Sequence, residues 1–195
     1  MSALLEARRL AIPDVIELMP KRFGDHRGYL SEVYNKQRFA AETGVVIDFM
    51  QVNQSLSAEK ATLRGLHFQA PPFAQAKLIV AVTGAAFDVA VDMRRGSPTY
   101  GKWVSVTLSS EKGNQVLVPA GFAHGFLTLA PDTIMQYQVD NPYSPTHEGG
   151  IRWDDPALAI NWPIGAVVPT LSKRDAAFPP LGEIETPFRV EETRP

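Results

Sequence analysis

Short segments in which apolar and polar residues alternate with a period of two run through most of this sequence. They are rich in β-branched and aromatic residues, and turn-forming pairs separate them; the clearest are YLSEVY, KLIVAVT, FDVAVDM, KWVSVTL, QVLVP, GFLTL and IMQYQV. Such alternation is typical of strands with one buried face. So many short strands predict a single all-β domain over residues 1–195, either a β-sandwich or a jelly-roll barrel. The pattern does not choose between these two architectures.

Only NKQRFAAETG, residues 35–44, has the marks of a helix. Asn35 can cap its first turn, Phe39 supplies an inward residue, and Gly44 can end it in the left-handed conformation. After Asp155 the alternation gives way to a Pro-rich stretch, in which DPALAINWP could form a helical turn. We therefore expect one or two short helices and an irregular C-terminal tail.

The balance of charges and the distribution of apolar residues exclude some partners. With 19 Lys and Arg against 21 Asp and Glu, the sequence predicts no broad positive surface for nucleic acid. The most apolar run, KLIVAVTGAAFDVAVDM, is broken by Thr83, Gly84 and Asp88, and so indicates two strands rather than a membrane span. The start, MSALLEARRL, lacks the apolar core of a signal peptide, and there is no cysteine. These features favour a cytoplasmic protein without membrane contact.

The stretch LRGLHFQ, residues 63–69, holds a histidine inside a strand-like apolar run. In a regular strand His67 shares a face with Gly65 and Gln69, whereas Arg64 points to the opposite face. If both side chains serve one site, a turn or bulge at Gly65 must re-aim one of them.

A second stretch, VPAGFAHGF at residues 118–126, has a P-x-G-x-x-H spacing that resembles the second motif of cupins, which are jelly-roll barrels. Metal-binding cupins add an H-x-H pair and a glutamate, because a divalent cation needs several converging ligands. Here the earlier stretch offers only His67, and the chain has 4 histidines in all. We therefore expect a metal-free barrel, with a mixed histidine and carboxylate site as the alternative.

A longer series of motifs resembles one family. The fragments FGDHRG, QVNQS, LRGLHFQ, QAKLI, FDVAVDMR, SPTYGKW, VPAGFAHGF, IRWDDPALAINWP and LSKRD follow the order and approximate spacing of the dTDP-4-dehydrorhamnose 3,5-epimerase family, from about Ile12 to Leu181. Members of that family are metal-free cupins without a cofactor, usually homodimers. They convert dTDP-4-keto-6-deoxyglucose to dTDP-4-keto-rhamnose on the way to dTDP-L-rhamnose. The resemblance implies the same fold, substrate and assembly here.

That reaction sets the chemistry that a site must supply. A proton next to a ketone is acidic only when the resulting enolate is stabilised. Epimerisation at carbons 3 and 5 of a 4-keto sugar therefore needs a base on one face, a cation or donors at the keto oxygen, and an acid on the opposite face.

The resemblance assigns these roles to four residues. His67 matches the base, and an imidazole with an ordinary pKa of about 6.5 is mostly neutral at cytosolic pH. Asp175 matches the carboxylate that orients this histidine. Tyr137 matches the acid, and Lys77 matches the cation near the enolate. Without the resemblance, ordinary structural roles would be the better interpretation: a core histidine, a loop acid, a core tyrosine and a strand-end lysine.

Further residues match positions that hold the substrate in the family: Arg27, Glu32, Gln51, Asn53, Arg64, His124, Tyr143, Glu148 and Arg174. The three arginines are candidate diphosphate contacts, because guanidinium groups bind phosphate oxygens with directed bonds. Gln51 and Asn53 could hydrogen-bond to thymine or ribose, and Tyr143 matches a tyrosine that stacks on the thymine ring. Each of them could equally be an ordinary surface residue, and the histidine could be a cupin ligand position kept for packing or hydrogen bonding.

Two acids lie on one face of the apolar strand FDVAVDM, which is unusual for a buried strand. They are Asp88 and Asp92, and we expect Asp88 to pair with Lys77 or Arg64.

Three alternatives stay open. Many family members carry two adjacent tyrosines where this chain has Pro142 and Tyr143. Enzymes that epimerise a single carbon also differ at this place. The nearest alternative is therefore an epimerase that acts on carbon 3 or carbon 5 alone. A metal-dependent cupin would need a bound divalent ion. A sensor that binds dTDP-sugars without turnover would not need an opposed acid and base.

Overall fold

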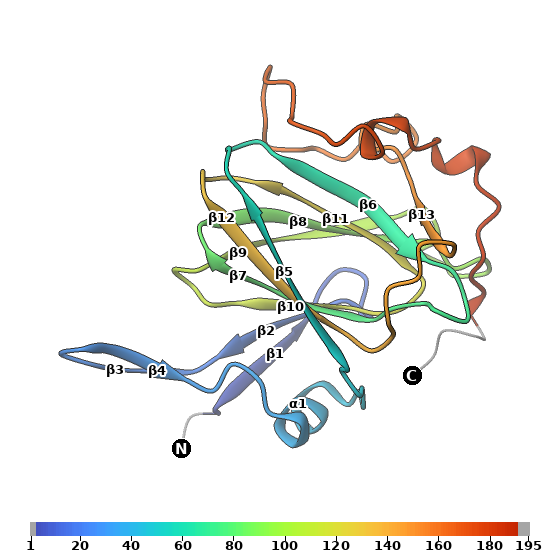
Figure 1. The fold of residues 1–195 in the computed structure, drawn as a ribbon. Coiled ribbons are helices and arrows are strands. Elements are labelled where there is room, and N and C mark those ends of the chain that lie inside the picture. The colour runs from blue at the N-terminus through green and yellow to red at the C-terminus, as the bar shows by residue number, and fades with distance from the viewer. Residues whose placement is uncertain (1–2, 191–195) are drawn as a thin grey trace.

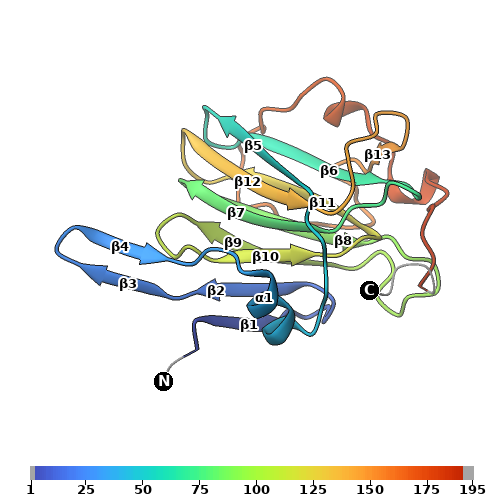
Figure 2. The same ribbon diagram turned by 60° about the horizontal axis from the view of Figure 1, so that its bottom comes forward.

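Two antiparallel sheets form the body of the protein, which is described by a computed structural model over residues 3–190. One sheet has the strand order β1 (Leu5–Arg9), β2 (Ile16–Pro20), β10 (Gln115–Val118), β7 (Lys77–Thr83), β12 (Thr133–Val139) and β5 (Gln51–Ser57). The other has the order β13 (Glu148–Gly150), β6 (Leu63–Gln69), β11 (Phe122–Thr128), β8 (Ala85–Asp92) and β9 (Trp103–Ser109). The sheets face each other (Figure 2), and the prediction of an all-β jelly roll is confirmed.

A third, two-stranded sheet stands apart from this body. It is the hairpin of β3 (Arg22–Asp25) and β4 (Gly28–Ser31), which projects from the barrel at the left of Figure 1. The predicted strand at residues 29–34 is therefore shorter than expected, because β4 ends at Ser31 and the chain then leads to the helix.

The space between the two large sheets is filled by apolar side chains from both. Ile79 and Met135 of one sheet pack with Ala90, Leu108 and Phe126 of the other, and all five are buried. Burying one large apolar side chain stabilises a fold by about 1.5–3 kcal/mol, so this cluster fixes how the sheets face each other.

The one α-helix of residues 3–190 forms where the sequence predicts it. It is α1 (Lys36–Thr43); the Asn35 side chain accepts a hydrogen bond from the Arg38 N–H at 3.1 Å, and Gly44 ends the helix with a φ of 72°. Phe39 is buried, as expected. None of the helices in residues 3–190 has the length and apolarity that a membrane span requires.

The C-terminal stretch is irregular, as predicted, apart from two single-turn 3-10 helices, η1 (Asp175–Ala177) and η2 (Leu181–Glu183). DPALAINWP forms a turn in which the Asp155 carbonyl accepts from the N–H groups of Leu158 and Ala159, and no helix follows. Trp162 and Phe188 from this stretch pack against the apolar residues of β6 and β8. The tail thereby covers the five-stranded sheet.

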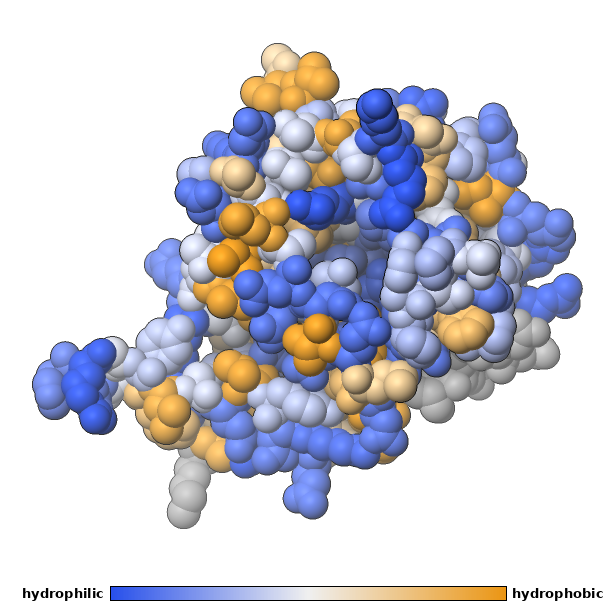
Figure 3. Space-filling view, in the orientation of Figure 1, coloured by the Kyte–Doolittle hydropathy of each residue, from blue (hydrophilic) through white to orange (hydrophobic). Residues whose placement is uncertain are grey.

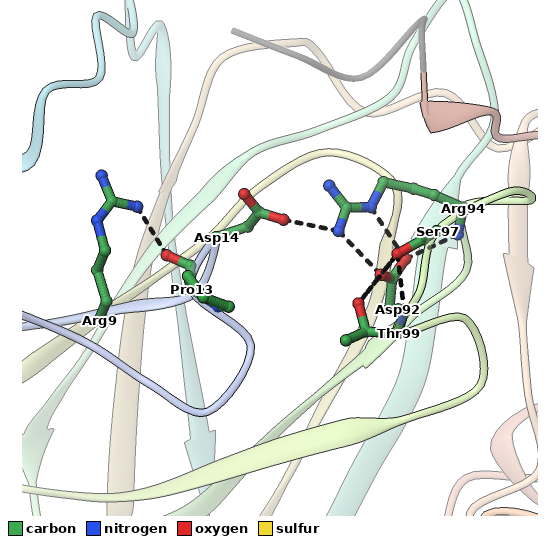
Figure 4. Close-up of polar contacts among 7 residues, drawn as sticks. All are labelled: Arg9, Pro13, Asp14, Asp92, Arg94, Ser97 and Thr99. Atoms are coloured by element: carbon green, nitrogen blue, oxygen red, sulfur yellow. Dashed lines mark hydrogen bonds and ion pairs between the residues drawn. The ribbon is translucent and has the colours of Figure 1, made fainter.

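One of the two acids on β8 is explained by its place at the end of the barrel. Asp92 is fully buried and accepts hydrogen bonds from the Arg94 guanidinium and from the hydroxyls of Ser97 and Thr99, while Arg94 also donates to Asp14 (Figure 4). Burial alone would raise the pKa of Asp92, but these donors outweigh it and lower that pKa. The cluster ties the loop after β1 to the end of β8.

Candidate active site

A cleft of about 660 Å³ opens between the two sheets. Its walls come from β5, β6, β7, β11 and β12, together with residues 170–175. On the face shown in Figure 3 the surface is hollowed, and mostly hydrophilic residues surround the hollow. All four predicted catalytic residues line this cleft: His67, Lys77, Tyr137 and Asp175.

A bulge in β6 brings Arg64 and His67 into the same cleft. His67 pairs with His124 and Arg64 pairs with Phe126, so the two residues between them on β6 face one residue on β11. Gly65 lies in this bulge with a φ of 128°, and a Cβ there would come within 2.5 Å of the Gly125 backbone. The extra residue reverses the alternation of faces, which confirms the expectation that Gly65 re-aims one side chain.

His67 and Asp175 meet although they are 108 residues apart in sequence. The His67 Nε2 and Asp175 Oδ1 atoms lie 2.8 Å apart. The Asp175 carboxylate also accepts from the Gly65 N–H at 3.3 Å. Burial raises the pKa of Asp175, but the interaction with His67 and the backbone donor outweigh it, so that the pKa is lowered. Asp175 therefore stays an anion and keeps a proton on the imidazole nitrogen that it contacts.

Tyr137 faces the cleft from β12, directly opposite Asn53 of β5. Burial raises the pKa of the Tyr137 hydroxyl. The positive charge of Arg64 lowers this pKa, and the negative charge of Glu148 raises it further. Within residues 3–190 the hydroxyl has no hydrogen-bond partner. Tyr137 is consequently a protonated phenol that is free to donate to a bound molecule.

Lys77 begins β7, on the wall across from β6. Burial lowers its pKa to about 8, and the negative charges of Glu148 and Asp88 limit this fall. At pH 7 the ammonium form therefore still dominates. Within the described part of the chain its Nζ makes no hydrogen bond or ion pair. The Lys77 ammonium group can therefore bind a negatively charged atom of a molecule in the cleft.

The prediction that Asp88 pairs with Lys77 or Arg64 is wrong. Asp88 Oδ2 lies 2.8 Å from His124 Nε2, and both side chains are buried. The register explains this, since Asp88 faces Phe126 on β11 and is therefore the diagonal neighbour of His124 on the same face. Lys77 belongs to the opposite sheet, and β11 separates Arg64 from β8.

The rim of the cleft carries a chain of polar contacts. Glu148 accepts from the Tyr143 hydroxyl at 2.8 Å and from the Arg174 guanidinium at 2.5 Å. A second guanidinium nitrogen of Arg174 lies 3.5 Å from His67 Nε2. These predicted ligand positions are therefore close to one another and to the candidate base.

The remaining wall is the inward face of β5, where polar residues alternate. Gln51 and Asn53 point inward and hydrogen-bond to each other at 2.8 Å. Ser55 continues this row, and its buried hydroxyl oxygen has no partner within the described residues. Sequence analysis missed Ser55, although its position two residues after Asn53 and four after Gln51 puts it on the same face of a strand.

Two of the predicted ligand residues lie away from the cleft. Arg27 is at the turn of the β3–β4 hairpin, where its guanidinium pairs with Asp25 at 2.6 Å. Glu32 follows β4 and pairs with Arg38 at 2.8 Å. The fold of one chain does not bring these two residues to the other site residues.

A second cavity, of about 800 Å³, lies at the end of the barrel and shares no lining residue with the cleft. The charged residues that line it already bind groups of the protein; they are Arg9, Asp14, Asp48, Arg94 and Asp140. Arg9 donates to the Pro13 carbonyl, and Arg94 donates to Asp14 and Asp92 (Figure 4). Arg9 also donates to the Thr43 carbonyl. Nothing there resembles an opposed acid and base.

In residues 3–190 no three His, Asp or Glu side chains converge as a metal site. The two histidines of the cleft each contact one carboxylate, Asp175 for His67 and Asp88 for His124.

Comparison with known proteins decides the family. The model of the dTDP-4-dehydrorhamnose 3,5-epimerase family matches residues 9–183. The chain belongs to this family. The resemblance in the sequence motifs is thereby confirmed, and with it the assignment to the isomerases and to the cupin-type jelly rolls.

Relatives and solved structures of the family match nearly the whole chain. The dTDP-4-dehydrorhamnose 3,5-epimerase of Sinorhizobium fredii is 52% identical over 183 residues, which cover 92% of this chain and 91% of the relative. The dTDP-6-deoxy-D-glucose-3,5-epimerase of Legionella pneumophila, solved with dTDP-4-keto-L-rhamnose, is 40% identical with a TM-score of 0.88, covering 93% and 95% of the two chains. ChmJ, a 3'-monoepimerase of Streptomyces bikiniensis solved with dTDP-quinovose, is 36% identical with a TM-score of 0.83, covering 89% and 86%.

Proposed function

We propose that this member of the family epimerises carbons 3 and 5 of dTDP-4-keto-6-deoxy-D-glucose, giving dTDP-4-keto-L-rhamnose for dTDP-L-rhamnose biosynthesis. The observation that carries the proposal is one cleft holding a carboxylate-oriented histidine, a protonated tyrosine and a lysine. These groups supply the base, the acid and the cation that the reaction needs, so that no cofactor is required.

His67 is the proposed base. Asp175 holds a proton on one imidazole nitrogen, which leaves the lone pair of the other nitrogen to accept a proton from the sugar carbon. The electron pair of the broken C–H bond moves into the enolate, and the negative charge develops on the keto oxygen. Asp175 then stabilises the imidazolium that forms.

Lys77 is the proposed partner of the keto oxygen. Its ammonium group is unpaired in the described part of the chain and lies in a partly buried site, where an ion pair with an enolate is stronger than in water. The neutral ketone of the substrate gains less from this cation than the enolate does, so Lys77 favours the charged intermediate.

Tyr137 is the proposed acid. Its hydroxyl proton goes to the carbon on the face opposite His67, which inverts the centre. Exchange with solvent then returns a proton to the phenolate and removes one from the imidazolium. Solvent deuterium must therefore appear at each inverted carbon.

The other cleft residues are proposed to hold the nucleotide. Arg64 and Arg174 are suited to the diphosphate, with Glu148 as the present partner of Arg174. Gln51 and Asn53 are suited to thymine or ribose, and Tyr143 at the rim can stack on the base. His124, fixed by Asp88, offers a further polar contact in the floor of the cleft.

We further propose a homodimer, acting in the cytoplasm, in which the hairpin of one chain reaches the cleft of the other. The hairpin projects from the barrel and exposes Tyr29 and Leu30, and β5 exposes Val52 and Leu56. Hydrophobic patches are visible on this face in Figure 3. Such a contact would cover these residues and would give Arg27 and Glu32 a role at a cleft that they cannot reach in their own chain.

A single-centre epimerase is the second candidate, favoured by the similarity to a 3'-monoepimerase. Proton NMR in heavy water separates the two functions. The protein is incubated with dTDP-4-keto-6-deoxyglucose, and loss of signal at carbons 3 and 5 is followed. Exchange at both carbons, with product consumed by a rhamnose-forming reductase, supports the full epimerase. Exchange at one carbon identifies the single-centre enzyme, and none at either contradicts both.

A further inference from the structure

Phe178 contacts the candidate base from outside the cleft. The Phe178 and His67 ring centroids are 5.6 Å apart with the rings at 74°, an edge-to-face arrangement. Phe178 is not among the residues that line the cleft, so it contacts His67 without reaching a bound molecule. The imidazole is therefore held on two sides, by Asp175 through a hydrogen bond and by Phe178 through its ring.

Gly150 provides the space for this ring. It pairs with His67 across β13 and β6. A Cβ added at Gly150 would lie 2.4 Å from the Phe178 Cε2 atom and 2.5 Å from Cζ, closer than real contacts allow. Its backbone is an ordinary strand, so the glycine is required here by the neighbouring ring rather than by its conformation.

Phe178 and Asp175 come from the same short segment. Asp175 begins η1 and Phe178 follows its last residue, Ala177, whose N–H donates to the Arg174 carbonyl at 3.0 Å. Directly beyond, the Pro179 carbonyl accepts from the Arg152 N–H at 2.9 Å, just after β13. The segment is thereby pinned on both sides of Phe178, and a ring fixed in this way can restrain its neighbour.

We propose that Phe178 is a positioning residue that, with Gly150 making room for it, fixes the orientation of the His67 imidazole for proton abstraction. The inference rests on the proposed function of His67 as the base. Small displacements of a reacting group are costly, and a shift near 1 Å can lower a rate on the order of a hundredfold.

Phe178→Leu is the first test, because leucine keeps an apolar side chain but loses the ring edge. We expect kcat for epimerisation to fall on the order of tenfold to a hundredfold. KM and the affinity for dTDP should stay close to wild type, because Phe178 does not touch the cleft. The matched control is Phe73→Leu, since Phe73 packs its ring against His147 at 4.7 Å outside the cleft and should leave kcat unchanged.

Gly150→Ala tests the same contact from the other side. The added methyl group must displace the Phe178 ring, and kcat should fall although neither Phe178 nor His67 is altered. In Gly150→Ala/Phe178→Ala the methyl group enters vacated space. The double variant should therefore lose no more activity than Phe178→Ala alone, whereas two merely destabilising changes would add.

Proton NMR of the His67 N–H that bonds to Asp175 reports the environment of the imidazole independently of turnover. The signal is assigned by its absence from the spectrum of His67→Asn. We expect a resolved signal in the wild type and in Phe73→Leu, and a broadened or shifted one in Phe178→Leu. An unchanged signal together with a kcat within about twofold of wild type would overturn the proposal. If the wild type does not epimerise at all, the proposed function fails, while this signal still decides whether Phe178 positions His67.

Discussion

Two clusters of polar residues lie in this barrel, and they differ in how completely the protein satisfies their hydrogen bonds. At the end of the barrel, Asp92 Oδ1 accepts from the backbone N–H and the Nε of Arg94, and Oδ2 accepts from Arg94, Ser97 and Thr99. In the cleft, Tyr137 and Lys77 have no hydrogen-bond partner within residues 3–190, although burial shifts the pKa of both.

This difference separates a structural cluster from a reactive one. A polar group that is partly removed from water and has no partner costs stability. Tyr137 and Lys77 are two such groups in one cleft, and a bound molecule can supply the missing partners. The Asp92 cluster leaves no such opening on its carboxylate, and its role is to join β8 to the loop after β1. Substitutions in the two clusters should therefore change different quantities.

The largest expected effect is kinetic and follows from His67→Asn. Removing the base should slow carbon-bound proton exchange by about 10²–10⁴-fold. The affinity for dTDP should remain within a few-fold of wild type, because the nucleotide would contact other residues. Deuterium incorporation followed by NMR and calorimetric titration with dTDP measure the two quantities. Exchange at the wild-type rate would remove His67 from the role of base.

The next effect is on stability and follows from Asp92→Asn. Breaking one side of a buried ion pair costs about 3–5 kcal/mol, and we expect a loss toward the lower end of this range because Arg94 keeps Asp14 as a partner. The free energy of unfolding in urea measures this loss. The kcat of the folded variant should equal that of the wild type, and a fall in kcat would show that the two clusters are coupled.

Tyr137→Phe should sharpen the contrast between the reactive cleft and the structural Asp92 cluster, because it removes a hydroxyl that has no partner in the described residues. Net epimerisation should slow on the order of 10²-fold, whereas proton abstraction from carbon should slow less. The free energy of unfolding should stay the same or rise. If abstraction and net epimerisation fall equally, Tyr137 acts in abstraction or positioning instead of as the acid.

The smallest effect is a shift of the pH profile. Because the pKa of Lys77 is lowered to about 8, kcat/KM should fall as pH rises through that value and the ammonium becomes neutral. Glu148→Gln removes a negative charge that raises this pKa, so the midpoint should move to lower pH. The exposed acid Glu6 on β1 provides the control, since Glu6→Gln should leave the midpoint in place. A midpoint unaffected by Glu148→Gln would show that another group titrates.

Much of the fold could be predicted from local patterns, and the strands that were missed are short or carry little alternation. The strand at β7 and the caps of α1 follow from period-two alternation and from Asn35 and Gly44. Strands β1, β2, β3 and β13 were missed. Of these, β1 and β13 carry no alternation of burial, β3 is a short and mostly exposed segment, and β2 alternates over only five residues. β1 is exposed along most of its length, and β13 is the short segment EGG, which becomes a strand only by pairing with β6.

The candidate site divides in the same way. The motifs by themselves determined the family, the residue types of an acid, a base and a cation, and the need for an irregularity at Gly65, because each is written in a few neighbouring residues. Only the tertiary structure decided that Asp88 pairs with His124, that Phe178 packs against His67, and that Arg27 lies outside its own cleft. Those outcomes depend on strand register and on contacts across many residues, and a local pattern carries no information about which distant strand will lie beside it.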